Sequence, residues 1–192
     1  MKIIFGLGNP GQQYKDNRHN IGYRVLEELA NIRGAKLKRS FKLSAYLGED
    51  NIYDKKVLLV KPRTFMNNSG LCVRKVFDKY KPDISDILII YDDADLALGN
   101  IRFRERGSCA GHRGMSSVQS VLRTDEINRL RIGIGTPVCG ELSDYVLSDF
   151  NHSEKELLDS TIDKSAAACM DWIEQGINFV MSKYNRRGGN SG

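Results

Sequence analysis

A glycine-rich turn followed by a polar triplet is the part of this sequence best suited to chemistry. An apolar segment from Lys2 leads into Gly6-Leu7-Gly8-Asn9-Pro10-Gly11, and Arg18-His19-Asn20 follows shortly after. A turn of this kind puts the Asn9 amide and the His19 imidazole at the carboxyl end of a strand, where open α/β sheets bind ligands. An imidazole there can take up a proton, and an amide can hold a polar substrate.

The same turn also spells GxGxxG, the pattern of a dinucleotide-binding loop. Such a loop needs a helix that begins at the turn and an acid about 20 residues further on, at the end of a second strand. Here Pro10 and the polar run 12–17 delay the helical pattern, and Glu27 and Glu28 fall inside the first helix. Nucleotide binding is therefore a minor alternative, as is a purely structural turn.

Length and composition indicate one globular domain. The 192 residues are 41% hydrophobic, which suffices for a single core, and we expect a domain over residues 1–185 with a mobile tail at 186–192. The sequence has no signal-peptide pattern and no apolar run near the roughly 18 residues of a membrane span. We therefore expect a cytoplasmic protein without membrane contact, and a monomer. Four widely spaced cysteines predict buried or half-buried thiols rather than disulfides or a zinc site; they are Cys72, Cys109, Cys139 and Cys169.

Helical and strand patterns alternate along the chain. Hydrophobic periodicity predicts helices over about 20–33, 69–81, 115–122, 153–175 and 177–184, and strands over 2–7, 43–47, 57–60, 87–91, 101–106 and 130–134. The segments 43–47 and 57–60 predict a hairpin that turns around Glu49, Asp50 and Asn51. This order predicts a single-domain α/β fold with a twisted, mixed but mostly parallel sheet and helices on both faces.

Polar side chains occupy the connections between strands and helices, and these connections meet at one edge of such a sheet. The residues concerned are Asn9, His19, Asn67, Asp92, His112 and Arg113. We therefore expect them to lie close together.

Basic residues also follow a pattern. The formal net charge of +5 favours an anionic partner. Alternate residues of two predicted strands are arginines, so that each strand presents them on one face; they are Arg102, Arg104, Arg106, Arg129 and Arg131. A further cluster comprises Lys36, Lys38, Arg39 and Lys42. Together these residues predict a surface that tracks phosphates, with ordinary solvated faces as the alternative.

Five motifs in this order resemble the bacterial-type peptidyl-tRNA hydrolases. They are GLGNPG with Tyr14 and RHN, TFMNNSG from Thr64 to Gly70, YDDADL from Tyr91 to Leu96, the GHRG segment, and RLRIGIG. The resemblance covers nearly the whole chain. It implies an esterase that frees tRNA from peptides dropped by stalled ribosomes, without metal or cofactor.

The resemblance also implies roles for single residues. His19 would be the base that activates water, Asp92 would orient its ring, and Asn9 would sense that the substrate's amino group is acylated. Other matched residues would bind the 3′ end of the tRNA and the nearby peptide; they are Tyr14, Phe65, Asn67, Arg113, Asn20 and Met66. The predicted tRNA-backbone patch consists of Arg102, Arg104 and Arg131.

The chain departs from the family pattern at Arg113, where an asparagine is usual. Asparagine donates and accepts hydrogen bonds, whereas arginine only donates and carries a fixed charge. Arg113 would thus contact a tRNA phosphate or the reaction's oxyanion, or else pair with Asp93 or Asp95. The departure leaves a second function open, that of a catalytically weak or inactive RNA-binding relative.

Overall fold

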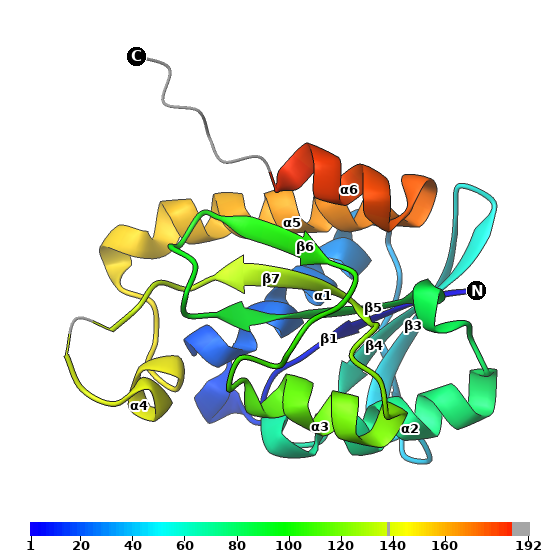
Figure 1. Ribbon diagram of the computed structural model, residues 1–192, viewed down its shortest axis with the longest axis horizontal. Coiled ribbons are helices and arrows are strands. Elements are labelled where there is room, and N and C mark those ends of the chain that lie inside the picture. Colours follow the sequence, from blue (N-terminus) through cyan, green and yellow to red (C-terminus); the bar gives the residue numbers. More distant parts are fainter. Residues whose placement is uncertain (138, 186–192) are drawn as a thin grey trace.

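A seven-stranded mixed sheet forms the centre of the computed structural model, which describes residues 1–137 and 139–185 (Figure 1). The strand order is β2-β3-β4-β1-β5-β7-β6. The central strands β4, β1, β5 and β7 are parallel to one another, and the outer strands β2, β3 and β6 pair antiparallel. The strands are β1 (Lys2–Gly6), β2 (Lys38–Ser40), β3 (Ala45–Ile52), β4 (Lys55–Pro62), β5 (Ile87–Asp93), β6 (Ile101–Arg104) and β7 (Asn128–Gly133). The predicted fold class is confirmed, and the predicted tail at 186–192 lies outside the described residues.

Helices cover both faces of the sheet. On one face lie α1 (Ile21–Ile32), α5 (Lys155–Gln175) and α6 (Ile177–Tyr184), and on the other lie α2 (Ser69–Tyr80) and α3 (Arg113–Leu122) (Figure 1). The short helix α4 (Leu142–Val146) stands apart from both layers, near the carboxyl ends of the central strands.

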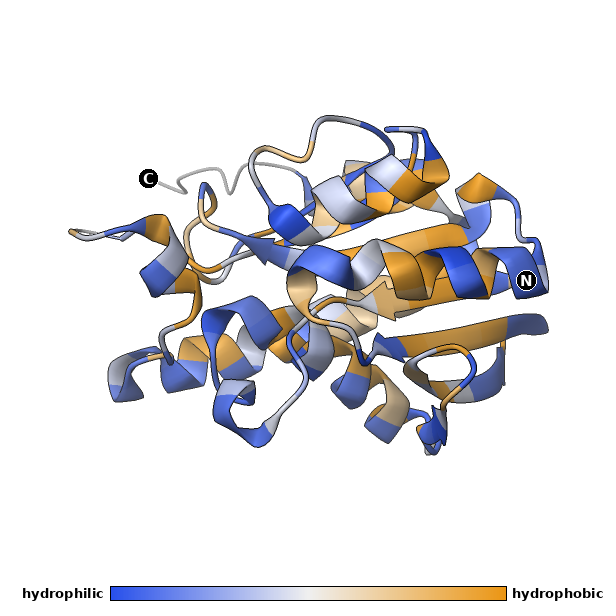
Figure 2. Ribbon diagram, turned by 90° about the horizontal axis from the view of Figure 1, so that it is seen from below, coloured by the Kyte–Doolittle hydropathy of each residue, from blue (hydrophilic) through white to orange (hydrophobic). Residues whose placement is uncertain are grey.

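The core has two halves because neighbouring residues of a strand point to opposite faces. In β1, Ile4 packs with the helices α1 and α5, whereas Ile3 and Phe5 pack with α2 and α3. Every residue of β5 is buried, as expected for a central strand covered on both faces. Figure 2 shows the hydrophobic strands between helices whose outer sides are hydrophilic.

The hairpin between β3 and β4 turns later than predicted. The turn lies at Tyr53 and Asp54, both with positive φ, and Glu49–Asn51 belong to β3. These polar residues resemble a turn in sequence because β2 pairs only with Ala45–Leu47 and leaves the rest of β3 at the sheet edge. The sequence patterns also missed β2 and α4, which have only three and five residues.

The glycine turn does not have the structure of a dinucleotide-binding loop. Two short 3-10 turns, Gln12–Tyr14 and Arg18–Asn20, follow Gly11, and α1 begins only at Ile21. A phosphate at the turn would therefore meet no helix N-terminus of the kind that this motif requires.

Two predicted basic clusters lie far apart in the fold. The lysine-rich segment 36–42 includes β2, the first strand of the sheet, whereas the arginines of 101–106 begin on β6, the last. The prediction that both belong to one phosphate-binding surface is therefore wrong.

The cysteines are free thiols. Cys72 and Cys169 are buried and Cys109 is half-buried, as predicted, but Cys139 is exposed. Within the described part of the chain, no helix combines the length and apolar character that a bilayer crossing requires.

Close contact between α1 and the sheet depends on Gly22. A Cβ atom at this position would lie 2.5 Å from the Ile90 carbonyl oxygen and 2.6 Å from that of Leu7. We expect Gly22→Ala to lower the free energy of unfolding by about 1–3 kcal/mol, because the helix must move away from the sheet. Urea denaturation measures this change. Asn31→Ala, on the exposed side of the same helix, should change stability by less than about 0.5 kcal/mol, and equal losses in both variants would contradict the explanation.

Candidate active site

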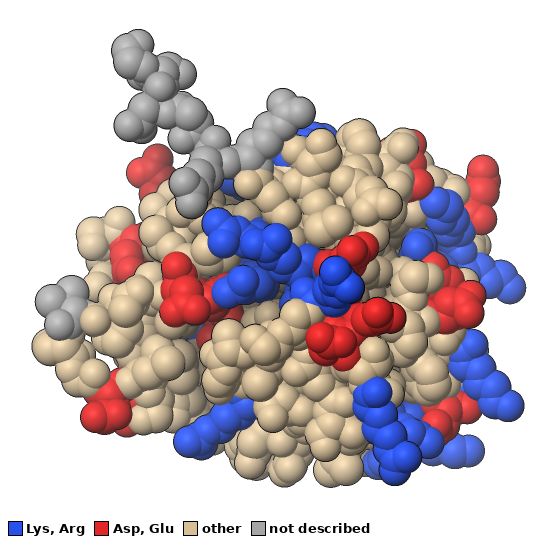
Figure 3. All heavy atoms as spheres, in the orientation of Figure 1, with Lys and Arg blue, Asp and Glu red and all other residues tan. Residues whose placement is uncertain are grey.

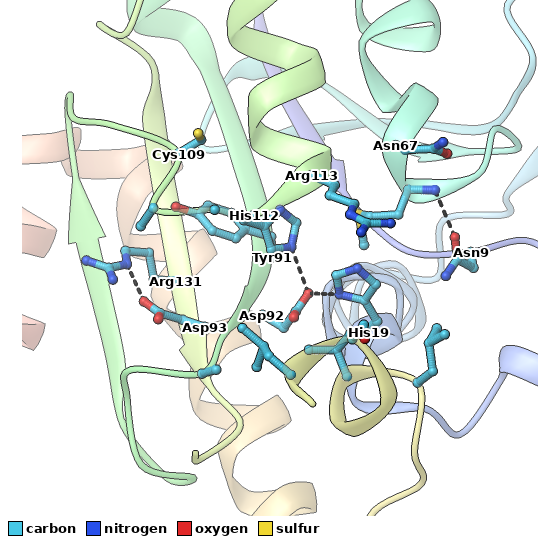
Figure 4. Close-up of a pocket in the computed structure, with 18 of the residues that line it drawn as sticks. Asn9, His19, Asn67, Tyr91, Asp92, Asp93, Cys109, His112, Arg113 and Arg131 are labelled. Carbon is cyan, nitrogen blue, oxygen red and sulfur yellow. Dashed lines mark hydrogen bonds and ion pairs between the residues drawn. The ribbon is translucent and has the colours of Figure 1, made fainter. Parts of the chain in front are cut away.

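A cavity of about 700 Å³ opens at the carboxyl ends of the central parallel strands (Figure 4). Most residues predicted for the site line this cavity, namely Asn9, His19, Phe65, Met66, Asn67, Asp92, Arg113 and Arg131. Tyr14, Asn20, Arg102 and Arg104 do not line it. The expected meeting of the strand-to-helix connections at one sheet edge is confirmed.

Two imidazoles share one carboxylate oxygen at the centre of the cavity. His19 lies in the 3-10 turn Arg18–Asn20 directly before α1, and its Nδ1 is 2.7 Å from Oδ1 of Asp92, at the end of β5. His112 precedes α3, and its Nε2 is 3.0 Å from the same oxygen. The contact expected between His19 and Asp92 is therefore present, but the contact of His112 was not predicted.

The surrounding hydrogen bonds fix which nitrogen of each ring carries the proton. The backbone N–H of Met115 donates to Nδ1 of His112 at 3.1 Å, so Nε2 of this ring must carry the hydrogen that is donated to Asp92. His19 donates from Nδ1 to Asp92 for a different reason, because an ionised carboxylate can only accept. Its Nε2 therefore carries the lone pair that a general base needs.

Asp92 is a buried anion stabilised by its two neighbours. Burial alone would raise the pKa of this carboxyl, but the nearby charges and hydrogen bonds of His19 and His112 outweigh burial and hold the pKa well below its usual range. The carboxylate is thus ionised and can stabilise a proton gained by His19.

The orientation of the Asn9 amide is also fixed. The backbone N–H of Met66 donates to Oδ1 of Asn9 at 2.8 Å, so the side-chain NH₂ is the group left for a ligand. Asn20 holds the backbone of Asn9 with two bonds, at 2.7 and 3.0 Å. Because Asn20 is buried and its amide is occupied, it lies behind Asn9 and not against the cavity, which corrects its expected position.

Arg18 connects the His19 turn to the wall of the cavity formed by α4. Its guanidinium makes two bonds to Glu154, at 3.0 and 2.7 Å, and lies over the rings of Tyr145 and Phe150, 4.4 and 4.6 Å from their centroids. Its backbone N–H donates to Ser148. No sequence pattern indicated this connection, because the partners of Arg18 lie more than a hundred residues away and match no motif.

The arginines of β6 and β7 have different surroundings. Arg131 forms an ion pair with Asp93 at the cavity wall and faces Arg102 across the two strands. Arg129 is buried and donates to backbone carbonyls, including that of Gly107 at 2.8 Å. The prediction that Arg129 would contact phosphates is therefore wrong. Figure 3 shows basic side chains gathered over β6, with acidic ones beside them.

Phe65 lines the cavity, as does Asn67, and Tyr14, which does not line the cavity, packs against Phe65. The rings of Tyr14 and Phe65 meet edge to face with centroids 6.2 Å apart, and Phe65 is 51% exposed. An exposed ring of this kind offers a stacking surface for a base.

The two imidazoles and the carboxylate at the centre of the cavity are also the one group in the described part of the chain whose arrangement could hold a metal ion. The ligand atoms of His19, Asp92 and His112 lie within 4.8 Å of one another. However, both ring N–H groups point at the carboxylate oxygen, and a cation would have to displace these protons. The arrangement therefore fits a hydrogen-bonded charge pair better than a metal site.

Comparison with known proteins gives a consistent result along the whole chain. A family model described as peptidyl-tRNA hydrolase matches residues 3–191. A peptidyl-tRNA hydrolase of Carboxydothermus hydrogenoformans is 47% identical over 189 residues, which cover 98% of this chain and 100% of that protein. One of Listeria innocua is 45% identical over 185 residues, with 96% and 100% covered. The crystal structure of peptidyl-tRNA hydrolase from Acinetobacter baumannii has a TM-score of 0.91 at 34% identity and covers 96% of this chain and 94% of its own.

The lowered pKa of Asp92 makes a prediction about stability. Because the native state binds this proton more weakly than the unfolded state, the carboxylate stabilises the fold above the unfolded pKa, about 3.9, and this stabilisation is lost as pH falls toward the native value. We expect the wild type to lose more unfolding free energy than Asp92→Asn between about pH 5 and about pH 3. The amide oxygen of asparagine can still accept both imidazole bonds, so the variant removes mainly the charge. Urea denaturation at several pH values measures the difference, and parallel pH profiles would refute this account.

Proposed function

The chain belongs to the peptidyl-tRNA hydrolase family, and we propose that it hydrolyses the ester between a peptide and the 3′-terminal ribose of tRNA with His19 as general base. This makes it a carboxylic ester hydrolase that recycles tRNA from peptidyl-tRNA released by stalled ribosomes. The single observation that carries the assignment of the base is the 2.7 Å contact between Nδ1 of His19 and Asp92. This contact leaves Nε2 free to accept a proton from water.

The reaction then proceeds in two steps. Nε2 of His19 takes a proton while the water oxygen bonds to the ester carbon, and the carbonyl electron pair moves to oxygen to give a tetrahedral oxyanion. When the oxyanion collapses, the bond to the ribose oxygen breaks, and this oxygen receives the proton from His19. Asp92 stabilises the imidazolium between the two steps. The peptide is formed as a carboxylic acid, which loses the second proton of the water to solvent and leaves as a carboxylate.

Asn9 accounts for a preference for N-blocked substrates. Its NH₂ group can donate to a carbonyl oxygen of a peptide or an acyl group. A free ammonium is itself only a donor, so it would meet this NH₂ without a hydrogen bond and with loss of hydration. Asn20 and Met66 act by holding Asn9 in this orientation.

The acceptor end of the tRNA would reach the cavity from β6 and β7. Arg102 and Arg104 lie on β6, and Arg131 lies between them and the site. Phe65, with Tyr14 behind it, would stack on the terminal adenine, and Asn67 beside it would bind the peptide backbone. One chain supplies all these residues, so we propose that the protein acts as a monomer, in the cytoplasm where tRNA is used.

The intact pair of His19 and Asp92 argues against the alternative of an inactive RNA-binding relative. A protein that only binds RNA gains nothing from burying an ionised carboxylate between two imidazoles, because such burial costs desolvation energy. We therefore favour hydrolysis.

The central test compares N-acetylated and free aminoacyl-tRNA as substrates. We expect the wild type to release tRNA rapidly from the acetylated substrate only, and His19→Ala to lower kcat by about 100-fold or more. Release of free tRNA measures both effects. His152→Ala is the control, since this histidine is exposed and lies in the 3-10 turn His152–Glu154 directly before α5. Tight tRNA binding with negligible hydrolysis by the wild type would support the RNA-binding alternative.

The arginine patch predicts how the tRNA backbone binds. Arg102→Ala with Arg104→Ala should raise KM several-fold, leave kcat nearly unchanged and weaken the salt dependence of binding, because phosphate contacts release counterions. Steady-state kinetics at several salt concentrations measure these effects. Lys38→Ala, at the opposite edge of the sheet, is the matched control. A lower kcat with unchanged KM would remove these arginines from tRNA binding.

A further inference from the structure

Arg113 places a positive charge at the cavity that no other described residue pairs with. It is the first residue of α3, it is exposed, and it lines the same cavity as His19. In Figure 4 its side chain extends from the start of the helix toward the space above the His19 ring. No ion pair or hydrogen bond of its guanidinium is recorded among the described residues.

The buried carboxylates near Arg113 are already neutralised by other groups. Asp92 accepts from the two imidazoles, and Asp93 pairs with Arg131. The remaining acids of the cavity wall, Asp95 and Glu141, form no recorded ion pair with Arg113 either. The expected pairing of Arg113 with Asp93 or Asp95 is therefore not found, and its five donors are available to a ligand.

The position of Arg113 separates it from the arginines that would bind the tRNA backbone. Arg131 and Arg113 lie on opposite sides of His112 in Figure 4. His112 in turn lies close to the general base, since the ring centroids of His112 and His19 are 5.1 Å apart. The charge of Arg113 thus belongs to the part of the cavity where the ester reacts, and not to the path of the phosphates.

We propose that Arg113 binds the negative charge that hydrolysis creates on the acyl group, first as the tetrahedral oxyanion and then as the carboxylate of the released peptide. This inference rests on the proposed function. The ester itself is uncharged, and the charge appears on its carbonyl oxygen when water adds. A guanidinium stabilises such an oxygen by a charge-assisted hydrogen bond, and its planar fork matches the two oxygens of the product carboxylate.

This role has a consequence that an asparagine at the same position would not have. An amide can donate to an oxyanion but carries no charge, so it holds a carboxylate only weakly. A guanidinium that accelerates the reaction also retains the peptide product. The structure therefore assigns to Arg113 both a gain in kcat and stronger inhibition by the peptide acid.

The test compares Arg113→Asn, Arg113→Lys and Arg123→Asn on N-acetylated aminoacyl-tRNA. Arg123 lies at the other end of α3 and is exposed, so it controls for a change in net charge. We expect Arg113→Asn to lower kcat about 10-fold or more with KM nearly unchanged. Arg113→Lys should retain part of the rate, and Arg123→Asn all of it.

Product inhibition gives a second measurement that a structural role would not affect. The inhibitors are an N-acetylated dipeptide acid and the matching C-terminal amide. In Arg113→Asn the inhibition constant of the acid should rise about 10-fold, while that of the amide stays the same.

Three results would overturn the proposal while the wild type cleaves its substrate normally. The first is that Arg113→Asn leaves both kcat and the inhibition constant of the acid unchanged. The second is that Arg113→Asn changes KM alone, which would indicate that Arg113 binds a tRNA phosphate. The third is that Arg123→Asn lowers kcat as much as Arg113→Asn does. A wild type that does not cleave would refute the proposed function instead.

Discussion

The structure depends most on one buried carboxylate that two imidazoles share. Asp92 is the second-last residue of the fully buried strand β5, so its charge lies where water cannot solvate it. The N–H groups of His19 and His112 replace that solvation. The two rings come from segments 73 and 20 residues away in the chain. The turn before α1, the end of β5 and the start of α3 must therefore be placed together, or a buried anion is left without partners. A glycine is needed where these segments pack most closely. A Cβ on Gly114 would lie 2.4 Å from the Met66 sulfur and 2.9 Å from Cε1 of His112.

Much of this arrangement could be predicted from the sequence because it follows from local patterns. The alternation of strands and helices indicates parallel strands, and parallel strands bring their carboxyl ends to one edge, so the proximity of Asn9, His19 and Asp92 is a topological result. The motif resemblance adds the roles expected of these residues. The sequence does not reveal which neighbour each side chain has. Arg129 and Arg131 have the same parity, yet one is buried among carbonyl oxygens and the other pairs with Asp93 at the cavity.

The features missed by sequence analysis depend on contacts between distant segments. Glu49–Asn51 are polar because β2 pairs only with Ala45–Leu47 and leaves them at the edge of the sheet. The sequence does not show where β2 ends, so these polar residues are mistaken for a turn. The sequence could not show what Asn20 binds either. Its amide can bond a substrate as well as it bonds the backbone of Asn9. Arg18 could not be recognised either, because its partners surround it only after α4 and α5 have folded against the His19 turn.

The cation–aromatic packing of Arg18 joins the α4 wall to the turn that carries His19. The guanidinium lies over the rings of Tyr145 and Phe150 and donates to Glu154. The backbone N–H of Arg18 donates to the carbonyl of Ser148. The wall and the turn that carries His19 are therefore tied together by the contacts of this one residue. Loss of the Arg18 side chain would therefore release the wall from the turn and disturb the position of His19, although Arg18 itself does not line the substrate cavity.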